Sequence, residues 1–370
     1  MAKLSDLAQM GQSIWLDFIS RSLIASGEMQ ALVSSGVRGM TSNPAIFEKA
    51  ISGAADYDAD MQALARAGKD TEAIYEELAI QDIRAAADVL RPVYDSTGGR
   101  DGFVSLEVSP FLARDTGGTI AEARHLYETV GRPNLMIKIP ATVEGLPAIT
   151  ASIGAGINVN VTLIFGIENY TAVAGAYMAG LETLAAGAPS ARGGHPVDRV
   201  SSVASFFVSR LDSALDPQME KAGARDLMGK IAVDNCRLAY AEYRRLLATP
   251  RWQTLAARGA RPQRVLWAST STKNPAYPDT LYVDELIGPD TVNTLPPETL
   301  KAFLDHGRAA ATIAADVEGS RRRVQRLAGL GIDLAQVTAR LQEDGVAAFA
   351  KPFKALLDGI EAKRRRMVAA

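Results

Sequence analysis

Short apolar runs rich in β-branched residues alternate with longer helical stretches along most of the chain, and this alternation constrains the fold more than any other feature. Strand followed by helix, repeated through one chain, indicates a parallel sheet with right-handed crossovers. Eight repeats favour a closed (β/α)8 TIM barrel, an α/β fold, over an open doubly wound sheet. The predicted strands are Ser13–Ile19, Gly36–Asn43, Gly102–Ser109, Asn134–Ala141, Gly156–Phe165, Arg199–Val208, Arg264–Thr270 and Thr291–Thr294.

We expect residues 1–370 to form one barrel domain with extra helices, including a C-terminal helical extension from about residue 298. The chain has neither a Gly-x-Gly-x-x-Gly turn after its first strand nor a Walker A sequence, which weakens the open nucleotide-binding alternative. Gly187–Pro196 is predicted to be a turn-rich loop. The predicted helical segments are Asp56–Arg91 with a break at Ala65–Thr71, Thr119–Val130, Glu168–Ala186, Asp216–Leu247 and Pro297–Ala315.

Composition and charge exclude several classes of protein. The formal net charge of -2 indicates no global attraction to nucleic acid or membrane, and the basic runs Arg321–Arg323 and Lys363–Arg366 are interpreted as solvated helix ends. The single cysteine, Cys236, excludes an intrachain disulfide and fits a reducing compartment. Neither a signal peptide nor an uncharged apolar run of about 18 residues occurs. We expect a cytoplasmic protein with no nucleic-acid or membrane partner.

Lys138 lies inside Asn134–Ala141 (Asn-Leu-Met-Ile-Lys-Ile-Pro-Ala), an apolar run that otherwise predicts a fully buried strand. Burial of an ammonium group is costly and favours loss of its proton. A neutral amine is a nucleophile that forms a Schiff base with a carbonyl substrate. Pro140 predicts that the strand ends there, so Lys138 is expected near the end where parallel barrels carry their chemistry. The alternative is a lysine that reaches the surface from an edge strand.

Polar residues alternate with apolar ones in the predicted fifth strand. Asn158, Asn160 and Thr162 share one face, and the other face is formed by Ile157, Val159, Val161 and Leu163. The apolar set is expected to meet the helices, so the polar set points into the barrel. Because buried amides need hydrogen-bond partners, this pattern predicts a polar site in the lumen rather than an exposed sheet face.

Carboxylates and amides occupy similar places on other predicted strands. Glu107 shares a face with two serines, and a lone buried carboxylate is costly unless it is hydrogen-bonded, paired with a cation or protonated. Asp17 lies among apolar neighbours, with a helix cap as the alternative interpretation, and Asn43 precedes a proline, with simple turn chemistry as its alternative. Because barrel strands converge on one site, this repetition predicts a single polar centre.

The ends of the sixth and seventh strands predict an anion site. Trp267–Pro275 (Trp-Ala-Ser-Thr-Ser-Thr-Lys-Asn-Pro) offers small hydroxyl residues, backbone N–H groups and Lys273 to a phosphate. Arg210 follows the sixth strand and suits a bidentate contact with the same phosphate. The alternative for Arg210 is an ion pair at the start of a helix, with Asp212 or a later acidic residue.

Metal and cofactor sites are not predicted. The three histidines, His125, His195 and His306, are widely scattered, and the chain has no Cys/His cluster. This disfavours a zinc-dependent aldolase against the Schiff-base class. A serine-hydrolase triad is also disfavoured, because no Gly-x-Ser-x-Gly sequence occurs.

Five segments of the chain form a recognisable set: Met40–Phe47 (Met-Thr-Ser-Asn-Pro-Ala-Ile-Phe), Met136–Thr142 followed by Glu144-Gly, Gly156–Phe165, Trp267–Pro275 and Gly288–Pro296. Together they resemble the transaldolase family, from about Ser13 to about Pro297, and the last two resemble its longer bacterial subfamily in particular. The resemblance implies a (β/α)8 barrel that transfers a dihydroxyacetone unit through a Schiff base and needs no cofactor.

The resemblance also implies substrates and roles. The usual reaction converts sedoheptulose 7-phosphate and glyceraldehyde 3-phosphate to erythrose 4-phosphate and fructose 6-phosphate in the non-oxidative pentose phosphate pathway. Lys138 matches the Schiff-base lysine, Asp17 the acid/base of the first strand, Glu107 the carboxylate of the third strand, and Thr162 the hydroxyl that helps to hold a catalytic water. The expected substrate-binding residues are Asn43, Asn160, Ser205, Phe207, Arg210 and Lys273, of which Lys273 replaces an arginine of shorter relatives.

Two rival functions share this scaffold. A lyase similar to fructose 6-phosphate aldolase is the first, although such relatives are shorter and use a tyrosine as the acid. The second is a sugar-phosphate-binding barrel without catalysis, and the joint presence of Lys138, Asp17 and Glu107 argues against it. Either a monomer or a homodimer is compatible with the sequence.

Overall fold

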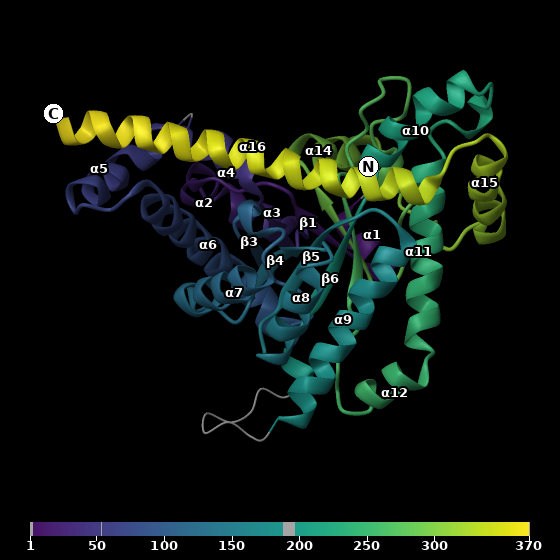
Figure 1. Cartoon of the computed structure of the whole chain (residues 1–370), viewed down its shortest axis with the longest axis horizontal. Helices are drawn as coiled ribbons and strands as arrows, with labels where there is room; N and C mark the ends of the chain where they lie inside the picture. The colour runs from purple at the N-terminus through teal and green to yellow at the C-terminus, as the bar shows by residue number, and fades with distance from the viewer. Residues whose placement is uncertain (1–2, 53, 188–196, 370) are drawn as a thin grey trace.

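The protein is a closed barrel of eight parallel strands in the order β1 to β8, and β8 pairs with β1 to close it (Figure 1). The computed structural model describes residues 3–52, 54–187 and 197–369. The predicted loop Gly187–Pro196 therefore lies outside the described residues, apart from its first residue. All eight predicted strands are present, which confirms the fold class: β1 (Gln12–Leu16), β2 (Gly39–Thr41), β3 (Phe103–Glu107), β4 (Leu135–Pro140), β5 (Val159–Ile164), β6 (Ser202–Phe207), β7 (Arg264–Ala268) and β8 (Thr291–Leu295).

The helices surround the barrel, and two predicted helical segments were wrong in extent. The segment predicted over Asp216–Leu247 is broken, because Gly223 and Gly229 adopt positive φ angles of 74° and 71° that end one helix before the next begins. The segment predicted over Pro297–Ala315 ends at His306. The helices are α1 (Leu4–Gln9), α2 (Arg21–Ala25), α3 (Glu28–Ser35), α4 (Pro44–Ser52), α5 (Asp58–Arg66), α6 (Thr71–Ser96), α7 (Thr116–Val130), α8 (Gly145–Gly154), α9 (Ile167–Ala186), α10 (Ser209–Lys221), α11 (Ile231–Leu247), α12 (Pro250–Ala256), α13 (Leu281–Asp284), α14 (Pro297–His306), α15 (Val317–Gly329) and α16 (Leu334–Ala369).

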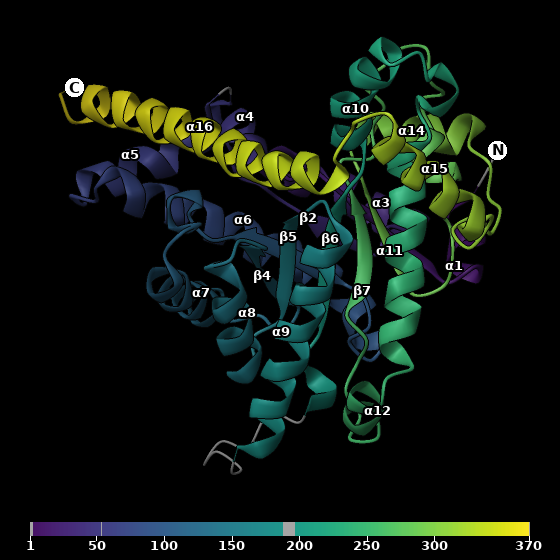
Figure 2. The same ribbon diagram turned by 45° about the vertical axis from the view of Figure 1, so that its right-hand side comes forward.

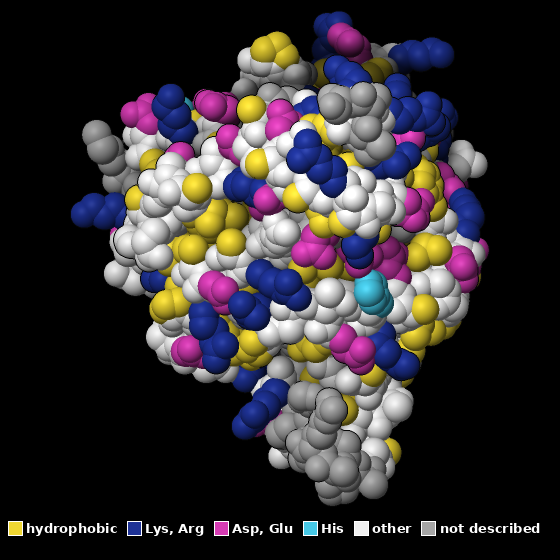
Figure 3. All heavy atoms as spheres, turned by 90° about the vertical axis from the view of Figure 1, so that its left-hand side faces the viewer, with side chains coloured by type: hydrophobic (Ala, Val, Ile, Leu, Met, Phe, Trp, Pro, Cys, Tyr) yellow, Lys and Arg dark blue, Asp and Glu magenta, His cyan; other side chains and the backbone are white. Residues whose placement is uncertain are grey.

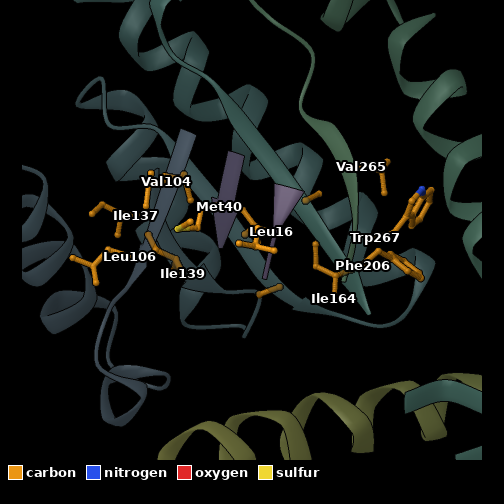
Figure 4. Close-up of a cluster of buried hydrophobic side chains, with 14 of the residues drawn as sticks. Leu16, Met40, Val104, Leu106, Ile137, Ile139, Ile164, Phe206, Val265 and Trp267 are labelled. Atoms are coloured by element: carbon orange, nitrogen blue, oxygen red, sulfur yellow. The ribbon is translucent and has the colours of Figure 1, made fainter. Parts of the chain in front are cut away.

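Alternation along each strand sends one set of apolar side chains outward against the helices. Figure 4 shows this buried layer, in which neighbouring strands contribute side chains at matching heights. Burial of this continuous layer is the main favourable contribution to folding. The labelled members are Leu16, Met40, Val104, Leu106, Ile137, Ile139, Ile164, Phe206, Val265 and Trp267.

Leu163 does not follow the alternation predicted for β5. The pairing of β5 with β6 shifts register between Val161 and Ile164, and Leu163 has a φ of 61°, a left-handed conformation that is costly for a leucine. Its side chain joins the cluster of Phe165 and Phe207 instead of the outer layer. The sequence expectation for Leu163 was therefore wrong, because an irregularity in the strand reverses its direction.

A buried polar network closes the N-terminal end of the barrel. Arg264 lies 3.0 Å from Asp101 and donates a hydrogen bond of 2.8 Å to Ser13 Oγ. Asp101 also accepts a hydrogen bond of 3.0 Å from the indole nitrogen of Trp15. Above this network, inward-facing apolar side chains fill the lower lumen. These are Phe103, Met136, Val203, Leu266 and Val292.

The C-terminal helix α16 crosses the opposite end of the barrel, where the strands have their carboxyl ends (Figures 1 and 2). It packs on α4, α5 and α6 and contacts β5. Within the described segments, no helix is both long enough and apolar enough to span a membrane. The face shown in Figure 3 carries interspersed basic and acidic side chains, in keeping with the small net charge.

We predict that Arg264→Met destabilises the protein by about 3–5 kcal/mol, because it leaves the buried Asp101 carboxylate without its cation. The measurement is the free energy of unfolding in urea. The matched control is Arg91→Met, which removes an exposed ion pair with Asp95 within α6 and is expected to cost at most about 0.5 kcal/mol. Equal losses in the two variants would contradict a structural role for the network.

Candidate active site

A cavity opens at the carboxyl ends of the strands, where most of the predicted site residues meet. Glu107 and Asn160 lie behind its wall, and each contacts a residue that lines it. This position matches the end at which (β/α)8 barrels carry their sites. The cavity is lined by Asp17, Thr41, Asn43, Lys138, Thr162, Ser205, Phe207, Arg210, Ala268, Ser269, Ser271, Lys273, Thr294, Pro296 and Phe349.

Lys138 is buried at the centre of this site. Its Nζ lies 3.1 Å from Glu107 Oε2, and both side chains are only 6% exposed. The same Nζ donates a hydrogen bond of 3.2 Å to the carbonyl of Ser42. Lys138 and Glu107 are partners in the register of β3 and β4, so the barrel itself sets their separation. The alternative of a lysine on an edge strand was wrong, because the barrel has no edge.

Asp17 follows β1 and faces the same ammonium group. It accepts a hydrogen bond of 2.7 Å from Thr41 Oγ1, and Thr41 shares a second hydrogen bond of 2.6 Å with Thr294. Asp17 is not a helix cap, since Ser20 caps α2. Burial raises the pKa of Asp17, opposed by the charge of Lys138 and by the bond from Thr41.

The same balance acts on Glu107. Burial raises the pKa of its carboxyl group, the charge and the hydrogen bond of Lys138 lower it, and the nearby Asp17 raises it again. A carboxylate with a raised pKa is a stronger base than an exposed one. Glu107 and Asp17 therefore both suit proton transfer to and from groups near the amine.

Asn160 is fixed by hydrogen bonds across the lumen. Its Nδ2 donates to Ser105 Oγ at 3.0 Å, and its Oδ1 accepts from Ser205 Oγ at 2.7 Å. These contacts confirm that the polar face of β5 points inward. On the same face, Thr162 Oγ1 is buried and has no hydrogen-bond partner among the described residues, which leaves its hydroxyl for a water or a substrate. Asn158 instead forms side-chain hydrogen bonds with backbone groups at the start of the strand.

Asn43 takes part in a turn and also lines the cavity. Its Oδ1 accepts hydrogen bonds of 3.0 Å from the backbone nitrogens of Ala45 and Ile46, which confirms the turn chemistry. The side chain also lines the cavity. The start of α4 therefore holds this amide at the mouth of the site.

Arg210 lines the cavity and lies beside two aromatic rings. Its guanidinium carbon lies 5.3 Å from the ring centre of Phe207 and 5.9 Å from that of Phe349. No described residue accepts a hydrogen bond from Arg210, so its donors are free for an anion. Burial lowers the pKa of the Arg210 guanidinium below its ordinary value. Lys273 lines the same cavity and donates a hydrogen bond of 2.7 Å to Ser271 Oγ.

The predicted alternative of an ion pair between Arg210 and Asp212 was wrong. Asp212 is buried and its two oxygens are occupied by the hydroxyl of Tyr282 at 2.7 Å and the backbone nitrogen of Ala232 at 2.9 Å. Burial raises the pKa of Asp212 to about 7. Asp212 therefore belongs to the packing between α10 and α11 and leaves Arg210 to the cavity.

Sequence reasoning did not name several residues that line the site, among them Thr41, Thr294 and Phe349. Thr41 and Thr294 point inward from β2 and β8, and the alternation used for β5 would have found Thr294. Phe349 lies on α16, far along the chain, and covers the cavity with its ring. Nothing local in the helix sequence indicates which of its residues enters the barrel.

Comparison with known proteins agrees with this geometry. The family model described as Transaldolase/Fructose-6-phosphate aldolase matches residues 14–360. The chain is 47% identical to a transaldolase of Trichodesmium erythraeum over 98% of both chains, and 50% identical to one of Parafrankia sp. over 96% of both. It is 51% identical to a transaldolase of Acidothermus cellulolyticus over 94% of this chain and 92% of that one. The chain therefore belongs to the transaldolase/fructose-6-phosphate aldolase family, among the transferases called transaldolases.

Proposed function

We propose that this transaldolase moves a dihydroxyacetone unit between sugar phosphates through a Schiff base on Lys138. The usual pair would be sedoheptulose 7-phosphate with glyceraldehyde 3-phosphate, in the non-oxidative pentose phosphate pathway. The observation that carries the proposal is a buried amine 3.1 Å from a carboxylate, in a cavity that is also lined by a guanidinium with free donors. This arrangement suits a ketose with a terminal phosphate.

The first step is formation of the Schiff base. Glu107, 3.1 Å from Nζ, is placed to take a proton from Lys138, and its raised pKa favours that transfer. The amine then attacks the C2 carbonyl of the ketose, and loss of water gives an iminium. The buried hydroxyl of Thr162 is suited to hold this water, because it has no hydrogen-bond partner among the described residues.

The second step is cleavage of the C3–C4 bond. Asp17 takes the proton of the C4 hydroxyl, the bond breaks, and its electron pair enters the iminium to form an enamine. The aldose phosphate leaves and an acceptor aldose phosphate enters. The enamine carbon attacks the acceptor carbonyl, Asp17 returns the proton to the new hydroxyl, and hydrolysis of the iminium frees Lys138. Asn43 and Asn160 are placed to bind sugar hydroxyl groups during these steps.

Dependence on an acceptor tests the function directly. Fructose 6-phosphate is offered with and without erythrose 4-phosphate, and release of glyceraldehyde 3-phosphate is measured. A transferase releases it continuously only when the acceptor is present. Equal rates without the acceptor would establish the lyase alternative, and no release in either case would establish a binding barrel.

We also propose that residues 1–370 form one cytoplasmic domain. The packing of α16 on α4, α5 and α6 joins the C-terminal extension to the barrel. The only cysteine, Cys236, is a buried free thiol, which fits a reducing compartment. Fluorescence of the tagged chain in cells tests the cytoplasmic location. Limited proteolysis of the purified protein tests whether the chain forms one domain.

We predict that Asp17→Asn still forms the Schiff base but cleaves the C3–C4 bond about 10²–10⁴-fold more slowly, because the amide cannot take the C4 hydroxyl proton. The substitution keeps the hydrogen bond from Thr41 possible, so the fold should be intact. Single-turnover rates with fructose 6-phosphate, together with the amount of trapped adduct, measure the effect. Unchanged cleavage would assign the proton transfer to another group.

We predict that Arg210→Ala and Lys273→Ala each lower kcat/KM for fructose 6-phosphate by roughly 10- to 150-fold, because each loses a charge-assisted hydrogen bond worth about 1.5–3 kcal/mol. Fructose, which has no phosphate, should lose little as a donor. The comparison of both donors in each variant is the measurement. Equal losses on both donors would refute phosphate binding, and a loss confined to Arg210 would remove Lys273 from the site.

A further inference from the structure

One face of α16 is fitted to the catalytic end of the barrel. Gln342 donates hydrogen bonds from Nε2 to the carbonyls of Ala141 at 2.9 Å and Leu163 at 3.0 Å, at the ends of β4 and β5. Gly345 lies one turn further, where a Cβ atom would come within 2.9 Å of the Leu163 side chain. The helix therefore approaches β5 as closely as a glycine allows.

Phe349 follows on the same face of the helix and enters the lumen. Its side chain is buried, and it belongs to an apolar cluster with Leu163, Phe165 and Phe207. The left-handed conformation of Leu163, which is unfavourable for a leucine, turns that side chain toward this cluster. Backbone strain beside a site indicates that the inward position of Leu163 has a use.

The ring of Phe349 covers both cations of the site. Its centre lies 5.3 Å from Lys138 Nζ and 5.9 Å from Arg210 Cζ. The ring therefore lies close to the amine that would carry the Schiff base and to the guanidinium proposed to bind the phosphate. An apolar cover at this place limits the access of water to the reacting atoms.

Water access decides the fate of the enamine left on Lys138 after the aldose has departed. In transfer, the enamine carbon forms a bond to the acceptor carbonyl. In the competing route, that carbon takes a proton, and water then hydrolyses the iminium to dihydroxyacetone and the free amine. The competing route consumes one water overall, because hydrolysis of the iminium releases the proton that the carbon took up, and it turns the enzyme into a lyase.

We propose that Phe349 determines specificity by keeping water from the enamine until the acceptor arrives. This inference rests on the proposed Schiff-base function and extends it to a residue of the C-terminal helix. Phe349 acts by exclusion and transfers no proton. Its loss should therefore change the partition between transfer and release more than it changes formation of the Schiff base.

The test compares Phe349→Leu and Phe349→Ala with Phe353→Leu in the full-length enzyme. Phe353 is also buried on α16, but its ring packs on Tyr75 and Phe111 outside the lumen. The ratio of dihydroxyacetone released to fructose 6-phosphate cleaved is measured with erythrose 4-phosphate present, because transfer and release compete only when an acceptor is available. We expect the ratio to rise about tenfold in Phe349→Ala, a change of about 1.4 kcal/mol in barrier difference, less in Phe349→Leu, and not in Phe353→Leu.

Borohydride trapping with fructose 6-phosphate distinguishes a failure of the Schiff-base function from a failure of the role proposed for Phe349. Wild-type enzyme that fails to trap would overturn the Schiff-base function itself. Trapping and transfer by the wild type, with an unchanged ratio in both Phe349 variants, would overturn only the role of Phe349. An equal rise in Phe353→Leu would also overturn it, because general loosening of α16 would then be the cause. Phe349→Leu keeps the test valid if the alanine variant does not fold.

Discussion

Burial of the Lys138 ammonium group beside Glu107 is the interaction on which the rest of the site depends. Removing two charges from water costs several kcal/mol per ion. A pair 3.1 Å apart in a barrel lumen therefore needs well-placed partners and a fixed geometry to offset that cost. The register of β3, β4 and β5 gives that support by setting Glu107, Lys138 and Asn160 side by side. Proton transfer across this pair is what makes the amine a nucleophile in the proposed mechanism.

The lumen divides into a structural lower part and a reactive upper part. Below, the network around Arg264 and Asp101 and the apolar layer above it fill the barrel. Above, hydroxyl, amide and charged groups surround a cavity that the ring of Phe349 covers. The strands thus contribute stability from their first residues and chemistry from their last, which is the usual division in this fold.

Local pattern was enough to predict the eight strands, the position of Lys138 near the end of its strand and the inward direction of Asn160. Alternation and the cost of burying a polar group act within a few residues, so both can be read from sequence. The reversal of Leu163 could not be predicted, because a register shift between two strands causes it. Phe349 could not be predicted either, since only the packing of a distant helix brings it to the site. The roles carried over from the family resemblance stay predictions.

Mass mapping of the borohydride-reduced adduct tests the central claim most directly. Enzyme is incubated with fructose 6-phosphate, reduced, digested and analysed for peptides that carry a reduced dihydroxyacetone unit. The account predicts one modified residue, Lys138, and no modification in a Lys138→Met variant that unfolds with a normal cooperative transition. Modification of another lysine in the wild type, or undiminished trapping in the variant, would contradict it.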